Sequence, residues 1–123
     1  MVIRQGDVAW VSLPAARGSA PAGRRPVVVL QHDRFNRTTI ATAVVVAITS
    51  KLKYGELPGN VRLRKGEAGL PRASVVNVTQ VATVDREHVG PRLGTLTDVR
   101  LAQVWAGVRL VCEPDLPTPD LTP

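Results

Sequence analysis

The spacing of the apolar segments constrains the fold of this chain more than any other feature. Residues 6–13, 26–31 and 40–49 each have the apolar character of a β-strand. The first connection is rich in Gly and Pro, and the second, residues 32–37, has room for one helical turn. Parallel strands need a longer crossover, usually a helix, so the pattern favours antiparallel pairing and disfavours a βαβ sheet. Because residues 26–31 and 40–49 are apolar on nearly every position, we expect both to be central strands.

Two further strands are predicted downstream. Residues 60–64 alternate and indicate an edge strand, and residues 74–84 form a longer strand. Gln80 falls among its apolar positions, which indicates either a buried hydrogen-bonding side chain or a β-bulge. The apolar face is expected to carry Val76, Val78, Ala82 and Val84, and the polar face Asn77, Thr79 and Thr83.

The last part of the chain predicts a helix and a tail. Thr97 is a good N-cap, and apolar residues recur at helical spacing up to Cys112, which we expect to be a small core residue. The fold class is α+β and mainly β: a small closed or partly open barrel of about five to seven strands, with short helical insertions and a C-terminal helix. Residues 1–112 form the domain, and residues 113–123 a Pro-rich acidic tail.

The charge indicates an anionic partner. Residues 1–112 hold all sixteen Lys and Arg with seven of the ten acids, a balance of +9. A polyanion or an acidic protein suits such a domain. The N-terminus has charge where a signal peptide is apolar, and the longest apolar stretch, residues 40–48, is too short to span a bilayer. We therefore expect a cytoplasmic protein without membrane association.

A pair of arginines is the first candidate for chemistry. Small, turn-forming residues 18–23 lead into Arg24 and Arg25, and Pro26 follows. Because Pro26 disfavours helix at the residue before it and can open a strand, Arg25 is expected to be extended at the barrel rim. Its planar charged fork suits a phosphate, although an ion pair across the barrel is the structural alternative. Trp10 is expected in the core or at a dimer contact rather than on RNA.

Most catalytic machinery is missing from the sequence. There is no Gly-rich phosphate loop and no Gly-x-Ser-x-Gly motif, and His32 and His88 have no partner at metal-ligand spacing. We therefore predict no metal and no cofactor. One reaction remains within reach, because RNA carries its own nucleophile, the ribose 2′-OH. Arg25 can stabilise charge on the phosphoryl oxygens, and Thr49 can donate a hydrogen bond.

The sequence resembles the MazF/PemK toxins across residues 4–111. The fragments that carry the resemblance are Gly6–Trp10, Ala16–Ser19, Arg25–Val29, Asp33, Asn36, Ile48–Ser50, Leu70–Pro71, Ser74–Val76, Gln80, Thr83–Asp85 and Gly94. The resemblance implies an SH3-like barrel that forms a homodimer. It also implies a metal-independent endoribonuclease that inhibits translation and growth by cutting single-stranded RNA at a short sequence, leaving 2′,3′-cyclic phosphate and 5′-OH ends. A MazE-type antitoxin, acidic and partly disordered, would occupy the basic groove.

The resemblance also assigns roles by position. It implies catalytic roles for Arg25 and Thr49, and the positions expected to bind RNA are Ser19, Arg24, Ser50, Lys51, Asn77, Thr79 and Gln80. Two departures leave the general base unassigned. Some relatives have a glutamate where this chain has Ala20, and the PemK branch has Arg and Asp where this chain has Asn77 and Thr79. The last two can offer an amide and a hydroxyl to a base edge or form a solvated face.

Two other functions stay open at this point. One is a non-enzymatic toxin of the same fold that poisons DNA gyrase, as CcdB does. That branch ends in Trp-Gly-Ile, whereas this helix reads Trp105-Ala106-Gly107-Val108 and runs into the tail. The other is a catalytically dead RNA-binding module, which Ala20 and Thr79 make conceivable. Mapped cuts in single-stranded RNA separate the enzyme from both.

Overall fold

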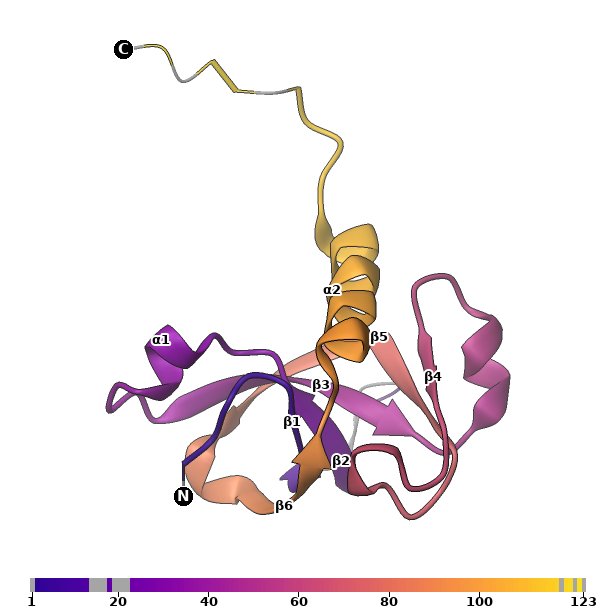
Figure 1. Ribbon diagram of the computed structural model, residues 1–123. Helices are drawn as coiled ribbons and strands as arrows, with labels where there is room; N and C mark the ends of the chain where they lie inside the picture. The colour runs from indigo at the N-terminus through magenta and orange to yellow at the C-terminus, as the bar shows by residue number, and fades with distance from the viewer. Residues whose placement is uncertain (1, 14–17, 19–22, 118, 121, 123) are drawn as a thin grey trace.

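The fold is a curled antiparallel sheet of six strands with a helix standing on it (Figure 1). The computed structural model describes residues 2–13, 18, 23–117, 119, 120 and 122. The strands run in the order β4-β5-β3-β2-β1-β6. Their bounds are β1 Asp7–Leu13, β2 Gly23–Val29, β3 Thr42–Thr49, β4 Val61–Leu63, β5 Ser74–Asp85 and β6 Val89–Thr95, with α1 Asp33–Asn36, α2 Asp98–Cys112 and the 3-10 turns η1 Leu52–Glu56, η2 Glu67–Gly69 and η3 Arg86–His88.

The mainly β fold class is confirmed, and apolar side chains pack on both faces of the sheet. One core lies under α2 and includes Val28, Val46 and Ile48. The other lies on the opposite face and includes Val27, Val29 and Val45. Residues 27–29 of β2 and most of β3 contribute to both cores, which is why these stretches are apolar at nearly every position. As expected, β4 lies at an edge of the sheet.

The start of β2 differs from the prediction. The strand begins at Gly23, so Pro26 lies inside it rather than at its first residue. The register with β1 covers Gly23 to Val28, whereas the register with β3 covers Val27 to Val29. Pro26 therefore lies where β2 pairs with β1, beyond the last residue paired with β3. A proline without an N–H is tolerated at such an edge-like position.

The prediction that one face of β5 carries all four apolar residues is wrong. Val46 of β3 pairs with Val81, but Ile48 pairs with Val76, so the register shifts between these pairs. Such an irregularity exchanges the faces of the strand on either side of it. Val76 and Val78 accordingly pack in the core under α2, whereas Ala82 and Val84 pack with the core on the opposite face. Gln80 is half-buried within the shifted stretch, as the bulge alternative predicts.

Strand β6 was not predicted, because Gly90, Pro91 and Gly94 are poor strand residues. Its pairing with β1 contains two register shifts, so these residues do not have to fit a regular ladder of hydrogen bonds. Backbone approaches help to hold it: a Cβ on Gly94 would lie 2.6 Å from the carbonyl carbon of Ala68. The turn η2 therefore packs directly on the β6 backbone.

The helix α2 begins as predicted and ends beyond the sheet. The Thr97 hydroxyl accepts a hydrogen bond from the backbone N–H of Arg100 at 3.2 Å. Val104 and Val108 are buried against the sheet, but Cys112 is exposed, so its expected core position is wrong. The last turn of α2 projects past the apolar surface that the earlier turns cover. No helix in the described part of the chain is long and apolar enough to cross a bilayer.

Candidate active site

The candidate site lies where β2 and β3 separate. These strands are antiparallel, and their pairing reaches Val27 opposite Ala47. The same register continued by two residues sets Arg25 opposite Thr49, with both side chains on the face of Val27 and Ala47. The two residues to which the resemblance assigns catalysis are 24 positions apart in sequence. Because the two central strands diverge at these ends, Arg25 and Thr49 lie at one opening between the strands.

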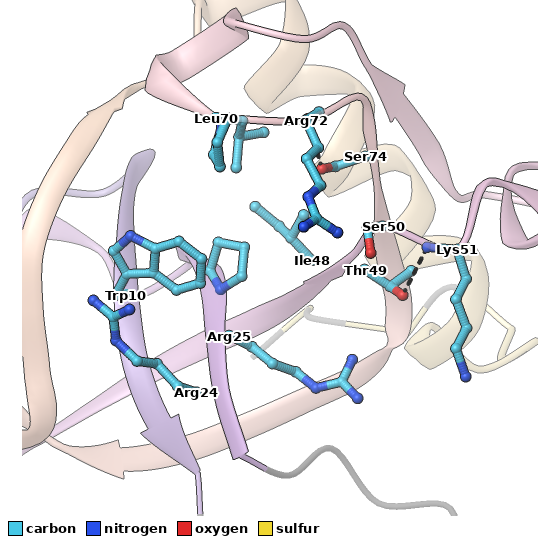
Figure 2. A pocket seen from close by; sticks show the side chains of 12 residues that line it. Trp10, Arg24, Arg25, Ile48, Thr49, Ser50, Lys51, Leu70, Arg72 and Ser74 are labelled. Carbon is cyan, nitrogen blue, oxygen red and sulfur yellow. Dashed lines mark hydrogen bonds between the residues drawn. The ribbon is translucent and has the colours of Figure 1, made fainter.

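A pocket of about 550 Å³ lies at this opening. Its size falls within the roughly 300–1,000 Å³ typical of small-molecule sites. Figure 2 shows Arg25 reaching from β2 toward Thr49, with the Arg72 guanidinium above them. The lining residues are Trp10, Arg24, Arg25, Pro26, Ile48, Thr49, Ser50, Lys51, Leu70, Pro71, Arg72 and Ser74. Four cationic side chains therefore line one cavity, an arrangement that suits an anion.

Thr49 is buried, with 6% of its surface exposed, and its hydroxyl is held in place. Its Oγ1 accepts a hydrogen bond from the backbone N–H of Lys51 at 3.2 Å (Figure 2). A hydroxyl that accepts still has its own proton to donate. The end of β3 and the start of the next turn thus fix the Thr49 hydroxyl in the pocket that Arg25 also lines.

Arg24 and Trp10 form a stacked pair at the pocket wall. The Arg24 guanidinium carbon lies 4.5 Å from the centroid of the Trp10 ring. Trp10 pairs with Pro26 in the β1–β2 register, so Arg24, two residues before Pro26, shares its face. Trp10 is half-buried and lines the pocket, and its expected core position is therefore wrong. Alternation along β1 places its side chain on the face of Val8, but Trp10 lies at the pocket rather than under α2.

Arg72 is a site residue that the sequence analysis missed. It is exposed, and it comes from the segment between η2 and β5. Its backbone carbonyl accepts a hydrogen bond at 2.9 Å from the hydroxyl of Ser74, the first residue of β5. In Figure 2 its guanidinium points into the cavity beside Ser50. The available sequence signal was the position of Arg72 just after Leu70–Pro71, in a fragment that also supports the family resemblance.

A partly buried ion pair links the segment that carries Arg72 to α2. Arg100 on α2 donates to Glu67 from Nε to Oε2 at 2.6 Å and from Nη2 to Oε1 at 3.2 Å. The Arg100 hydrogen bond, with help from the backbone N–H of Arg64, holds the pKa of Glu67 below its usual value. The Glu67 carboxylate therefore stays ionised, and the two-pronged contact fixes η2 relative to the helix.

The other residues expected to bind RNA are placed differently. Ser50 and Lys51 line the pocket with Arg24, but Asn77, Thr79 and Gln80 do not. Asn77 is buried, and its Oδ1 accepts hydrogen bonds from Asn60 Nδ2 at 3.4 Å and from Thr79 Oγ1 at 3.1 Å. Ser19 lies outside the described residues. The structure thus gathers the predicted residues of β2 and β3 and leaves those of β5 apart.

One group of metal-ligand type appears elsewhere. Asp85, Glu87 and His88 are exposed, with ligand atoms within 4.8 Å of one another. The expectation that His88 has no partner at such spacing is therefore wrong. His88 approaches Asp85 at 3.9 Å and Glu87 at 3.8 Å through different ring nitrogens, as in a solvated ion-pair cluster. None of the three lines the pocket that holds Arg25.

Comparison with known sequences decides the family. The family described as "PemK-like, MazF-like toxin of type II toxin-antitoxin system" matches residues 4–112. The chain belongs to this PemK/MazF family. Endoribonuclease MazF2 of Mycobacterium bovis is 38% identical over 113 residues, 92% of this chain and 99% of that protein. Endoribonuclease EndoA of Bacillus subtilis is 34% identical over 104 residues, covering 85% and 89%. The chain is a MazF-type endoribonuclease of the toxin–antitoxin class.

Solved structures agree with the fold. MazF from Deinococcus radiodurans has a TM-score of 0.75 at 25% identity, over 90% of this chain and 96% of that one. The Mycobacterium tuberculosis toxin MazF-mt6 has a TM-score of 0.72 at 19% identity, over 89% and 99%. The curled sheet with its C-terminal helix is therefore the MazF fold.

Proposed function

We propose that this MazF-type protein cuts single-stranded RNA at a short sequence, by attack of the ribose 2′-OH on the adjacent phosphate and without a metal ion. The single observation that carries the proposal is the pocket in which Arg25 and Thr49 converge. The new 2′-O–P bond forms as the P–O5′ bond breaks, the 2′-OH loses its proton, and the departing 5′-oxygen gains one. The products are a 2′,3′-cyclic phosphate and a 5′-OH, and the outcome for the cell is inhibited translation and growth.

Arg25 is assigned the largest share of the rate. As the 2′-oxygen attacks, negative charge builds on the non-bridging phosphoryl oxygens. A planar guanidinium can donate two parallel hydrogen bonds to them, and its strand position holds it in place before the reaction starts. The half-buried setting of Arg25 supports this role, because partial exclusion of water strengthens such a contact.

Thr49, Ser50 and Lys51 are assigned supporting roles. The Thr49 hydroxyl, held by the Lys51 N–H, is positioned to donate to the same phosphate. Ser50 and the Lys51 side chain are exposed beside it, where they can contact neighbouring phosphates of the strand. Ser19, Asn77, Thr79 and Gln80 remain predicted RNA contacts.

The described lining of the pocket lacks a general base of the usual kind. No Asp, Glu or His is among its described lining residues, and the printed sequence of residues 14–22 contains none. We expect the logarithm of the single-turnover cleavage rate to rise steadily between about pH 5.5 and 8.5, because no enzyme carboxylate or imidazole has to lose a proton. Quenched time courses at a series of pH values on one RNA substrate measure this dependence of the rate on pH. A bell or plateau with an apparent pKa of about 6–7 would show that a base from elsewhere takes part.

The direct test of the proposed function is cleavage in the absence of free metal. The purified protein is incubated with a long single-stranded RNA in excess EDTA, and both ends of every fragment are mapped. Recurrent cuts at one short sequence, with 2′,3′-cyclic phosphate and 5′-OH ends, are the expected result. Intact RNA contradicts the proposal. Cuts that appear only when Mg²⁺ is restored contradict it as well. Gyrase inhibition with intact RNA indicates the CcdB-like activity, and tight binding without cuts indicates a dead module.

We further propose an acidic antitoxin as the protein partner. Residues 1–112 carry a balance of +9, and the pocket is lined by four cationic side chains. An acidic, partly disordered MazE-type segment complements this surface and would compete with RNA for it. The family is defined by type II toxin–antitoxin pairs, and one Deinococcus radiodurans neighbour of this fold is described as MazE-MazF.

A homodimer is the proposed assembly. The resemblance implies one, and large apolar side chains on both helices are exposed in the single chain. Phe35 of α1 is 53% exposed, and Leu110 and Val111 of α2 are 64% and 44% exposed. A second copy that covers them would remove this apolar surface from water.

A further inference from the structure

The pocket at Arg25 has two halves of different chemistry. In Figure 2, Trp10 and Leu70 lie on one side, and the charged or hydroxyl ends of Arg25, Thr49 and Arg72 lie on the other. Pro26 also lines the pocket. The second half suits a phosphate. The first half offers flat, apolar surface within the same cavity of about 550 Å³. A nucleotide has the same division, with a charged phosphate and a base whose two faces are apolar.

Trp10 is the aromatic residue positioned to use this division. The chain has four aromatic side chains other than histidine: Trp10, Phe35, Tyr54 and Trp105. Of these, Trp10 lines the pocket, and residues 14–17 and 19–22, whose positions are not described, contain no aromatic residue. Bases of single-stranded RNA are commonly held by stacking on aromatic rings or on arginine planes. Stacking on an aromatic ring of this chain beside its own Arg25 therefore falls to Trp10. The Arg24 guanidinium over its ring supplies an arginine plane beside it.

The Trp10 ring is held in a defined orientation. Its backbone is fixed in the β1–β2 register opposite Pro26, and the Arg24 guanidinium lies 4.5 Å from the ring centroid. A half-buried indole with a cation on its face is a rigid flat surface that loses little conformational freedom when a base packs on it. The guanidinium adds a second plane of the same kind.

We propose that the Trp10–Arg24 pair is the stacking platform for the nucleobase next to the scissile phosphate. The proposal rests on the proposed RNA cleavage and adds a base-binding subsite to it. Arg25, Thr49 and Arg72 hold the phosphate, and the base of the flanking nucleotide packs on the indole and the Arg24 plane. Stacking contributes roughly 10- to 100-fold per base in binding, with little preference among bases. Trp10 therefore fixes the position of the strand, and its contact is with the substrate.

The test uses the fluorescence of Trp10 itself. Trp105→Phe leaves Trp10 as the single tryptophan of the chain. The probe is a short RNA that spans the mapped cut, with a 2′-deoxy nucleotide at the attacking position so that it is not cleaved. We expect the probe to quench Trp10 emission, because a base stacks on the ring. Trp10→Ala is expected to weaken probe binding about 10- to 100-fold, and Trp10→Phe to keep most of it.

An abasic series locates the base. Each nucleotide beside the cut is replaced in turn by an abasic residue, and binding is measured for the parent and for Trp10→Ala. At one flanking position the abasic change should weaken the parent about 10-fold or more and leave Trp10→Ala unchanged, as coupled partners require. Leu57→Ala, an exposed apolar residue outside the pocket and on neither α-helix, is the control and should bind as the parent does.

The outcomes separate the two proposals. Unchanged Trp10 emission, or equal abasic losses in the parent and in Trp10→Ala at every position, overturns the stacking platform while cleavage stands. If no RNA is cut, the proposed function and the platform fail together. Should Trp10→Ala not fold, Trp10→Phe and the quenching decide the question.

Discussion

Replacement of Arg25 by alanine is expected to lower the single-turnover cleavage rate by about 10²–10³-fold, which corresponds to roughly 3 kcal/mol of transition-state stabilisation. In the proposed mechanism, the guanidinium across from Thr49 neutralises the charge that builds on the phosphoryl oxygens. The fold should persist, because Arg25 is half-buried at the end of β2 and outside both apolar cores. Quenched-flow cleavage and circular dichroism of the same preparation measure the two expectations.

Two variants give this experiment its control. Arg25→Lys keeps the charge and removes the planar fork, so it should restore part of the lost rate if two parallel hydrogen bonds matter. Arg109→Ala removes an exposed arginine on α2, outside the pocket lining, and should cleave at the parent rate. Nearly normal cleavage by Arg25→Ala would show that the charge is stabilised by another group, with Arg72 the first to examine.

Gly107→Ala is expected to destabilise the protein by about 2–3 kcal/mol, although alanine in a helix interior usually stabilises by about 1 kcal/mol relative to glycine. A Cβ on Gly107 would lie 2.9 Å from Val78 Cγ1 and would clash with the carbonyl oxygen of Gly59. Backbone atoms at this contact cannot rotate away as a side chain can. The helix α2 would have to lift from the turn at Gly59 and from β5.

Chemical denaturation measures the change in the free energy of unfolding, with the midpoint as the readout. Ala106→Gly is the matched control, because Ala106 is the exposed neighbour on the same helix. It should lose about 1 kcal/mol through helix propensity alone. A stabilised Gly107→Ala protein would mean that α2 does not approach Gly59 this closely in solution.

The sequence predicted part of the arrangement at the candidate site, namely strand ends at Arg25 and Thr49. The apolar runs before Thr49 and after Arg25 identify two central strands, and antiparallel pairing of such strands brings their opposite ends together. Pro26 predicted an extended Arg25, although β2 begins before it. The cap at Thr97 was also predictable, because a side-chain oxygen just before a helix-periodic segment has a local cause. These features depend on interactions that are local in sequence or shared by two regular strands.

The parts that sequence analysis missed depend on long-range packing. The register shift in β5 comes from its pairing with β3, and alternation along β5 alone cannot show that its faces exchange. Trp10 follows the apolar pattern of a core residue, but its exposure is decided by where the pocket opens beside Pro26. Cys112 fits the helical period, yet the sheet beneath α2 has already ended there.

Because side chains alternate along β2, the sequence position of each of the two neighbouring arginines decides the face of the strand on which it lies. Arg24 contacts the indole, and Arg25 faces Thr49, because consecutive strand residues point to opposite sides. An insertion or deletion of one residue between positions 23 and 27 would exchange the faces of β2 on which the two arginines lie. Both contacts would then be lost. We therefore expect insertions and deletions among natural homologues to lie before position 23 and to be absent between positions 23 and 27. A set of related gene sequences tests this expectation.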